Sequence, residues 1–359
     1  MTVHDDVDSG SKSSIDSASS TSGKNAKSKN AGKSPIHSGN GGDSRKQDAA
    51  FKWGTAVAAL IVVALVAMIA LVLVVQGWQA LSLNQANFFT SGEWQTGSYK
   101  TDPSSFRFGI FDMLVVTVMS SIVALLIAVP IAVGIAVFLV QYAPARISRG
   151  LSTVIDLLAA VPSIVYGLWG ALVLAPFLSP VAEFLNKYLG WFFLFGDGNI
   201  ALIGNTVFTA SIVLAVMILP IITSMSRETI RQTPGLHQEA AMALGATRWE
   251  KIRMTCFPYA KSGIIAGAML ALGRALGETI AVMMILGATP IATIADPRQT
   301  NYSIFDGGAT FASKIASGAA EFNDPISTGA YIAAGLVLFI LTFVVNAIAR
   351  GFAGGKVNG

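Results

Sequence analysis

The chain has 359 residues and very few of those from which catalytic and metal centres are usually built. It contains one cysteine, Cys256, and three histidines that lie far apart in the sequence. A single cysteine excludes an internal disulfide, and these residues cannot supply a clustered set of metal ligands. We therefore expect neither a metal site nor a bound cofactor.

Charged residues are also scarce. Asp, Glu, Lys and Arg make up 12% of the chain and hydrophobic residues 53%, whereas roughly a quarter of the residues in soluble domains are charged. This balance is typical of a membrane protein. The net charge of +4 does not indicate nucleic-acid binding, because Lys and Arg lie mostly in segments that the positive-inside rule assigns to the cytoplasm.

Recognisable catalytic motifs are missing as well. The sequence has no HExxH, no GxSxG and no carboxylate cluster at a membrane face, which disfavours a membrane-embedded enzyme such as one that processes lipids. Gly32-Lys33-Ser34 resembles the end of a phosphate-binding loop, but Lys27 stands where that loop requires glycine. The chain is therefore predicted to have no ATPase site and not to be an enzyme.

Composition divides the chain at about residue 50. Residues 1–50 are rich in Ser, Lys, Asn, Gly and Asp and are too polar to form a core, so they are predicted to be a disordered cytoplasmic tail. Residues 51–359 contain six apolar runs that reach the about 20 residues a helix needs to cross a bilayer. The runs are 54–75, 113–140, 157–178, 200–222, 263–289 and 326–349. Because lipid cannot satisfy backbone polar groups, the fold is predicted to be all-α with six transmembrane helices.

The basic residues between the runs predict the orientation of the chain. Lys and Arg are in excess in the tail, in the link that contains Arg146 and Arg149, in the loop 227–261 and at the C-terminal end. These segments alternate with segments that lack such an excess, so both termini and the loop are expected in the cytoplasm. The long segment 290–325 then lies outside, either as a contact for a soluble delivery protein or as a plain surface loop.

The cytoplasmic loop 227–261 has the pattern of two short helices joined at a glycine. Thr233 is placed to cap a first helix, along which Leu236, Ala240 and Leu244 recur at helical spacing until Gly245, which favours the left-handed conformation. A capping box then starts a second helix, on which apolar residues form one stripe. The box is Thr247 to Glu250, the stripe is Trp249, Ile252 and Cys256, and Pro258 ends the helix. Since nothing in the loop covers either stripe, it requires a partner.

The sequence Glu239-Ala240-Ala241, with Gly245 six residues after the glutamate and Pro258 thirteen further on, resembles the EAA loop of ABC-importer permeases. The match departs at Thr255 and Phe257, where the family usually has Ile and Leu. The resemblance implies that Glu239, Ala240, Ala241 and Gly245 belong to a coupling helix that docks into a cleft on a cytoplasmic ATPase.

The run 263–289 contains an ionisable pair, Arg274 and Glu278. In a continuous helix they lie about 40° apart and share a face with the small residues Gly263, Gly267 and Ala281. A charge at the bilayer centre costs roughly 2.5–3.5 kcal/mol, so this face is expected against protein or water. The pair is then either an internal salt bridge or an anion site, in which Arg274 binds phosphate-like oxygens and Glu278 compensates its charge.

Residues 273–280 and 161–170 together resemble the C-type permeases of phosphate importers, from about residue 50 to the end of the chain. The resemblance implies an inner-membrane permease of a bacterial ATP-driven importer for inorganic phosphate, with Arg274 and Glu278 on the path. The implied partners are a homologous second permease, two copies of a P-loop ATPase, a soluble phosphate-binding protein outside and membrane lipid. Two alternatives stay open: an ion-coupled secondary transporter, and an importer for another anion such as sulfate.

Overall fold

The computed structural model describes residues 43–96, 102–192, 194–196, 204–287, 303–322 and 324–353. The prediction of a disordered tail, with Gly32-Lys33-Ser34, therefore falls mostly outside the described residues. The chain divides into two compact units, 1–62 and 63–359, at a point inside helix α1 (Asp43–Leu83). Residues 43–50, which composition assigned to the tail, form the first turns of this helix.

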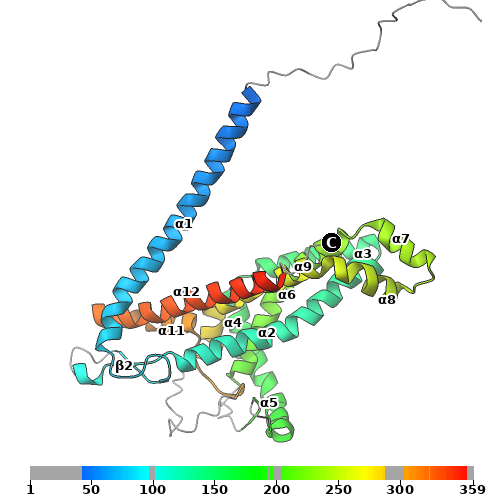
Figure 1. Cartoon of the computed structure of the whole chain (residues 1–359). Coiled ribbons are helices and arrows are strands. Elements are labelled where there is room, and N and C mark those ends of the chain that lie inside the picture. The colour runs from blue at the N-terminus through cyan, green and yellow to red at the C-terminus, as the bar shows by residue number, and fades with distance from the viewer. Residues whose placement is uncertain are drawn as a thin grey trace, which may run out of the picture. The chain divides into compact units, whose positions relative to one another are not determined.

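Helices dominate the described chain, and six segments are long and apolar enough to cross a membrane (Figure 1). They are Asp48–Leu83, Phe111–Tyr142, Ser163–Leu189, Val207–Arg231, Arg248–Leu276 and Pro325–Ile348. The prediction of an all-α fold with six spans is thus confirmed, with span ends that differ from the apolar runs by one residue in the sixth span and by more in the others.

Helix α6 (Val207–Arg231) is the centre of the unit 63–359. It packs against α2 (Phe111–Val137) on one side and against α9 (Phe257–Leu276) on another. Small residues make this approach close: Gly263 and Gly267 of α9 lie against Thr229 and Met225 of α6. The face of α9 that the sequence assigned to protein contact does contact protein at these two glycines.

The third apolar run is not one helix. Helix α3 (Ala145–Ala160) ends before Pro162, and α4 (Ser163–Trp169) begins after it and continues through a π-helical turn, η3 (Gly170–Leu174), into α5 (Ala175–Leu189). The link with Arg146 and Arg149 is therefore part of a 16-residue helix. Pro162 separates the two helices because proline disfavours the helical conformation of the residue before it.

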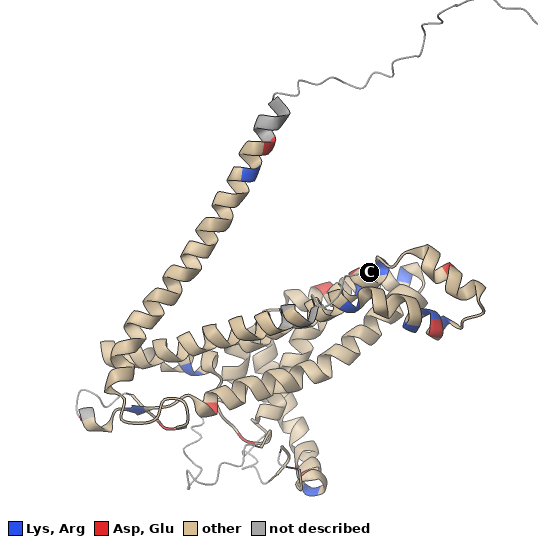
Figure 2. Ribbon diagram, viewed as in Figure 1, with Lys and Arg blue, Asp and Glu red and all other residues tan. Residues whose placement is uncertain are grey.

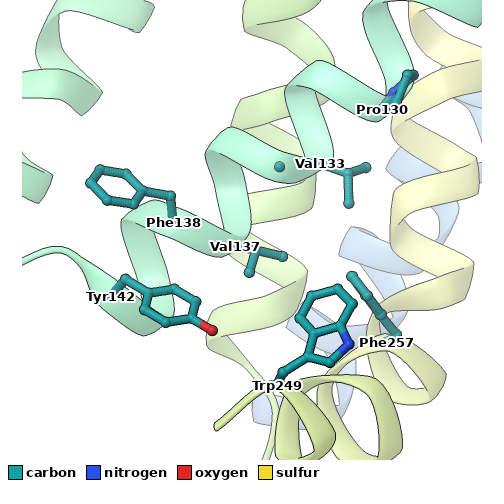
Figure 3. A pocket seen from close by; sticks show the side chains of 8 residues that line it. Pro130, Val133, Val137, Phe138, Tyr142, Trp249 and Phe257 are labelled. Atoms are coloured by element: carbon teal, nitrogen blue, oxygen red, sulfur yellow. The ribbon is translucent and has the colours of Figure 1, made fainter.

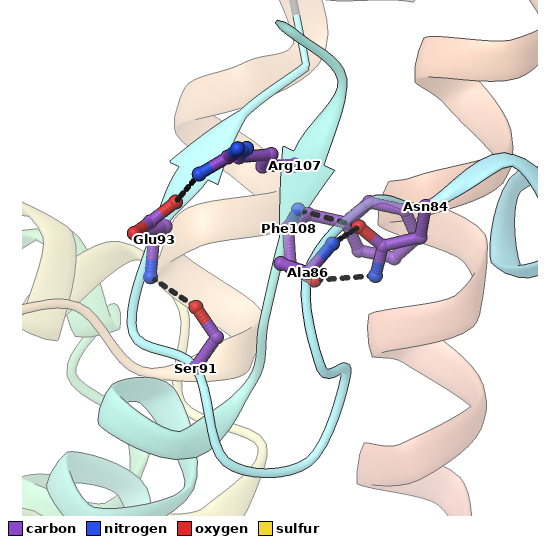
Figure 4. Close-up of polar contacts among 6 residues, drawn as sticks. All are labelled: Asn84, Ala86, Ser91, Glu93, Arg107 and Phe108. Atoms are coloured by element: carbon purple, nitrogen blue, oxygen red, sulfur yellow. Dashed lines mark hydrogen bonds and ion pairs between the residues drawn. The ribbon is translucent and has the colours of Figure 1, made fainter. Parts of the chain in front are cut away.

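A short hairpin follows α1. Strand β1 (Trp94–Gln95) pairs antiparallel with β2 (Arg107–Phe108), with Trp94 opposite Phe108. The Asn84 side chain donates to the Phe108 carbonyl and accepts from the Phe108 N–H, and Arg107 lies 3.7 Å from Glu93 (Figure 4). Two-residue strands produce no detectable alternation in sequence, so this element was not predicted.

The segment 290–325 is not a plain surface loop where the structure describes it. Its residues Phe305 and Phe311 are fully buried, and it contains α11 (Phe311–Ser317) and the 3-10 turn η6 (Gly318–Glu321). Helix α11 contacts α2, α10 (Ile280–Leu286) and α12 (Pro325–Ala353). The alternative of a loose loop is therefore wrong for residues 303–322.

Lys and Arg gather at the end of the unit 63–359 that carries α7 (Gly235–Ala243) and α8 (Arg248–Lys251) (Figure 2). Among the described residues of that end are Arg227, Arg231, Arg248, Lys251 and Arg253. This asymmetry is the one that the positive-inside rule uses to assign a cytoplasmic face.

Candidate functional site

The fifth span breaks in the middle of its apolar run. Helix α9 ends at Leu276, and α10 begins at Ile280, so that residues 277–279 are not helical. The expectation of one continuous helix over 263–289 is therefore wrong, and the spacing of about 40° between Arg274 and Glu278 does not apply. Backbone that is not helical is tolerated at membrane depth only where protein or water satisfies it.

A second break lies beside the first. Helix α4, which starts after Pro162, packs against α10, and a Cβ atom on Gly167 would lie only 2.8 Å from the Ala281 Cα atom. The Tyr166 hydroxyl donates to the Leu158 carbonyl at 2.8 Å and so satisfies an acceptor at the end of α3. The motifs 161–170 and 273–280, which are far apart in sequence, thus form one region of the structure.

Glu278 lies in the break and is almost fully buried, with 9% of its surface exposed. Its Oε1 atom accepts a hydrogen bond from the Ala281 N–H at 3.2 Å, which fixes the carboxyl group at the start of α10. Arg274, one turn earlier at the end of α9, is exposed. It lies within electrostatic range of Tyr166 of α4.

Arg274 and Glu278 form no ion pair within 4.0 Å in the part of the chain that the structure describes, where the ion pair present is that of Arg107 and Glu93. The interpretation of the pair as an internal salt bridge thus has no support in this geometry. An exposed guanidinium beside a buried carboxylate leaves the planar donors of Arg274 available to an anion.

The elbow, defined here as residues 233–251, is a second candidate region. Helix α7 ends in a Schellman motif: the Gly245 N–H donates to the Met242 carbonyl at 3.0 Å and the Ala246 N–H to the Ala241 carbonyl at 3.1 Å. Gly245 has φ +87°, the left-handed conformation predicted for it. The bend at this glycine is confirmed.

The two elbow helices, α7 and α8, are capped differently at their N-terminal ends. The capping box of α8 is present: the Thr247 N–H donates to Glu250 Oε2 at 2.8 Å, and the Glu250 N–H donates to Thr247 Oγ1 at 3.3 Å. The predicted cap at Thr233 is wrong. Pro234 occupies the N-cap position, and Thr233 Oγ1 is buried without a hydrogen-bond partner among the described residues.

The outer face of the elbow is apolar and uncovered in this chain. Leu236 is 79% and Leu244 89% exposed, and Glu239 and Ala240 are also exposed. Ala241 is 6% exposed and faces the body of the protein, where α7 contacts the π-helical turn η4 (Ile252–Cys256). The three residues of the Glu-Ala-Ala motif therefore divide between an outer face and an inner one.

On the second predicted stripe, Ile252 and Cys256 are fully buried, whereas Trp249 is 55% exposed. Trp249 instead borders an apolar pocket of about 420 Å³ between α8 and the end of α2 (Figure 3). The pocket is lined by Pro130, Val133, Gly134, Val137, Phe138, Tyr142, Trp249 and Phe257.

Comparison with known families and proteins gives consistent matches. The family model described as binding-protein-dependent transport system inner membrane component matches residues 128–355. The chain is 55% identical over 316 residues to the phosphate transport system permease protein PstC 2 of Mycobacterium tuberculosis, covering 88% of this chain and 94% of that protein. It is 57% identical over 291 residues to PstC of Mycobacterium leprae, covering 81% and 88%.

Solved structures similar to the chain include the methionine ABC transporter MetNI in inward-facing conformations. That match has 18% sequence identity and a TM-score of 0.44, and it covers 68% of this chain and 93% of that chain.

Proposed function

Because this chain belongs to the family of binding-protein-dependent transport system inner membrane components, and within it to the PstC phosphate-transport permeases, we propose that it forms one half of a phosphate path across the bacterial inner membrane. It is a multi-pass permease subunit of an ABC importer and not itself the ATPase. The family assignment stands against the ion-coupled secondary transporter considered from the sequence.

The path residues are Arg274 and Glu278. A dianion such as phosphate needs donors that are not already neutralised, and Arg274 is exposed without an ion pair among the described residues. Glu278, whose carboxyl group accepts from the Ala281 N–H, would limit how tightly an anion is retained. Transport requires such moderate binding, because the substrate must also leave.

The elbow is the proposed contact with the ATPase. Its exposed residues Leu236, Glu239, Ala240 and Leu244 present an apolar surface with one acidic side chain, and exposed apolar surface of this kind marks sites of contact with a partner. Gly245 sets the angle between the two elbow helices, α7 and α8. The buried Ala241 packs α7 against the rest of the protein. Closure of the ATPase would then move the elbow and open the path alternately to each side.

Binding-protein-dependent ABC importers work with ATPase and binding-protein partners. For this chain we propose a homologous second permease, two copies of a P-loop ATPase and an extracytoplasmic protein that binds phosphate, with both termini and the elbow in the cytoplasm. The gathering of Lys and Arg at the elbow end supports this orientation (Figure 2). Selectivity against sulfate would reside mainly in the binding protein, since charge alone does not separate the two anions.

The observation that carries the proposal is a helix break that contains the buried Glu278 and follows Arg274, which has no ion pair among the described residues, in a chain of this family. It is tested by reconstituting the complete complex in proteoliposomes and measuring uptake of labelled phosphate with ATP on the ATPase side. We expect uptake that competes with unlabelled phosphate and not with chloride. Uptake that persists without ATP, driven by an ion gradient, would refute it.

A further inference from the structure

Two of the π-helical turns meet where the elbow joins the membrane helices. Helix α2 ends in the π-helical turn η2 (Phe138–Tyr142), and α8 continues into η4. Such turns are rare and occur frequently at functional sites. Gln141 lies in η2, and its side chain reaches three segments of the elbow region.

The Gln141 side chain makes three hydrogen bonds to separate elements. Its Oε1 atom accepts from Lys251 Nζ of α8 at 2.8 Å, and its Nε2 atom donates to Gln238 Oε1 of α7 at 3.4 Å and to Cys256 Sγ of η4 at 3.5 Å. An amide offers two donor hydrogens and one carbonyl oxygen, so this side chain uses both kinds of group at once. Gln238 extends the network by donating to the Thr233 carbonyl at 3.2 Å.

In the described part of the chain, buried apolar contacts join η4 to α2 but do not join α8 to the end of α2. Ile252 and Cys256 of η4 pack with Ala136 and Val137 of α2. On the side of α8, however, the apolar pocket separates the elbow from the end of α2, and Tyr142 points across it toward Trp249 (Figure 3). The bond from Lys251 to Gln141 therefore joins α8 to η2 where close apolar packing is lacking.

We propose that Gln141 is the positioning residue that carries the motion of the elbow to helix α2. The inference rests on the proposed function, because it assumes that an ATPase moves the elbow. The Gln141 amide hydrogen-bonds to both elbow helices, α7 and α8, and so connects them to the end of α2. Helix α2 in turn packs along α6 and α9 toward the helix break at 277–279. When the elbow turns, α2 turns with it.

The test uses Gln141→Leu, which keeps the size of the side chain and removes all three hydrogen bonds. The matched control is Gln232→Leu: the Gln232 amide donates to Glu228 within the same helical end at 3.1 Å and, among the described residues, bridges no other element. Both variants are reconstituted with the second permease, the ATPase and the binding protein. Phosphate uptake, ATP hydrolysis and retention of the ATPase on purification are measured together.

We expect Gln141→Leu to retain the ATPase and its basal hydrolysis, while phosphate moved per ATP hydrolysed falls roughly tenfold, the effect of losing a hydrogen bond to a charged group. Gln232→Leu should behave as the native protein. Adding Lys251→Met to Gln141→Leu should cause little further loss, because both changes remove the same bond. Gln141→Glu, which still accepts from Lys251, should recover part of the coupling.

Three results would overturn the inference: an unchanged ratio of phosphate to ATP in Gln141→Leu, a parallel loss of uptake, hydrolysis and ATPase retention, and equal effects of the control. The parallel loss would show a purely structural role for Gln141. Failure of the native complex to transport phosphate at all would instead refute the proposed function, so the two failures are distinguished.

Discussion

Gly167 of α4 lies so close to Ala281 of α10 that a Cβ atom at Gly167 would be 2.8 Å from the Ala281 Cα atom and 3.1 Å from the Met284 Cβ atom. This contact joins two helices that each begin after a break, α4 after Pro162 and α10 after Thr279. Tyr166, which precedes Gly167 in α4, lies within electrostatic range of Arg274.

Substitution of Gly167 by valine should therefore separate α4 from α10. Overpacking of this kind costs about 1–3 kcal/mol, and here it would also displace the break that carries Glu278. We expect a lower thermal midpoint and loss of phosphate uptake. Gly134→Ala is the control, because a Cβ atom there would meet nothing within 4 Å. Equal activity of the two variants would show that the close approach is not required.

Replacement of Arg274 by glutamine should strongly reduce transport without destabilising the protein. Arg274 is exposed and unpaired among the described residues, so its loss removes no internal ion pair. We expect uptake to fall by roughly ten- to a hundredfold, as for lost hydrogen bonds to a charged ligand, with unchanged assembly and thermal midpoint. Arg107→Gln, which removes the pair with Glu93, is the control and should transport normally. Loss of assembly in Arg274→Gln would favour the structural salt bridge.

Gly245 should not tolerate a side chain, although space is available. A Cβ atom there would meet nothing within 4 Å, but φ is +87°, which costs a residue such as alanine about 1–2 kcal/mol. We expect Gly245→Ala to change the angle of the elbow and reduce ATPase retention on purification. Gly235→Ala, whose nearest neighbour would be Glu239 Oε1 at 3.9 Å, should have no effect. The prediction fails if the two alanine variants retain the ATPase equally.

The half-buried Lys314 should make the free energy of unfolding depend on pH in the alkaline range. Burial lowers its pKa below the ordinary value of 10.5, against the raising effect of the Glu321 charge. Between the lowered pKa and 10.5 the unfolded chain binds more protons than the folded one, so stability should rise as the pH rises through this range. Thermal unfolding in detergent measures the slope, which Lys314→Met should reduce. An unchanged slope in that variant would assign the effect to other groups.

Sequence patterns predicted some features better than others, for physical reasons. Apolar length identifies a span because lipid requires it, and the elbow was predicted because Gly245 and the Thr247 to Glu250 box act locally. The break at 277–279 and the burial of 303–322 depend on contacts with α4, α2 and α12, which are remote in sequence. Helix α3 was missed because its apolar end merges with the run that continues into α4.

The Gln141 network was also missed, since its members come from η2, α7, α8 and η4, and no sequence spacing relates them. A glutamine at the end of a span is common and does not by itself indicate a hydrogen-bond network. Only the fold brings it against Lys251 and Gln238.

The central claim, that the exposed face of the elbow receives the force of ATP hydrolysis, is tested most directly with Leu244→Asp. Leu244 is 89% exposed, so the change removes no buried side chain from the core of this chain. The measurement is ATP-driven phosphate uptake by the complete complex in proteoliposomes, alongside binding of the ATPase. The account predicts loss of both, whereas uptake and ATPase binding at native levels would contradict it.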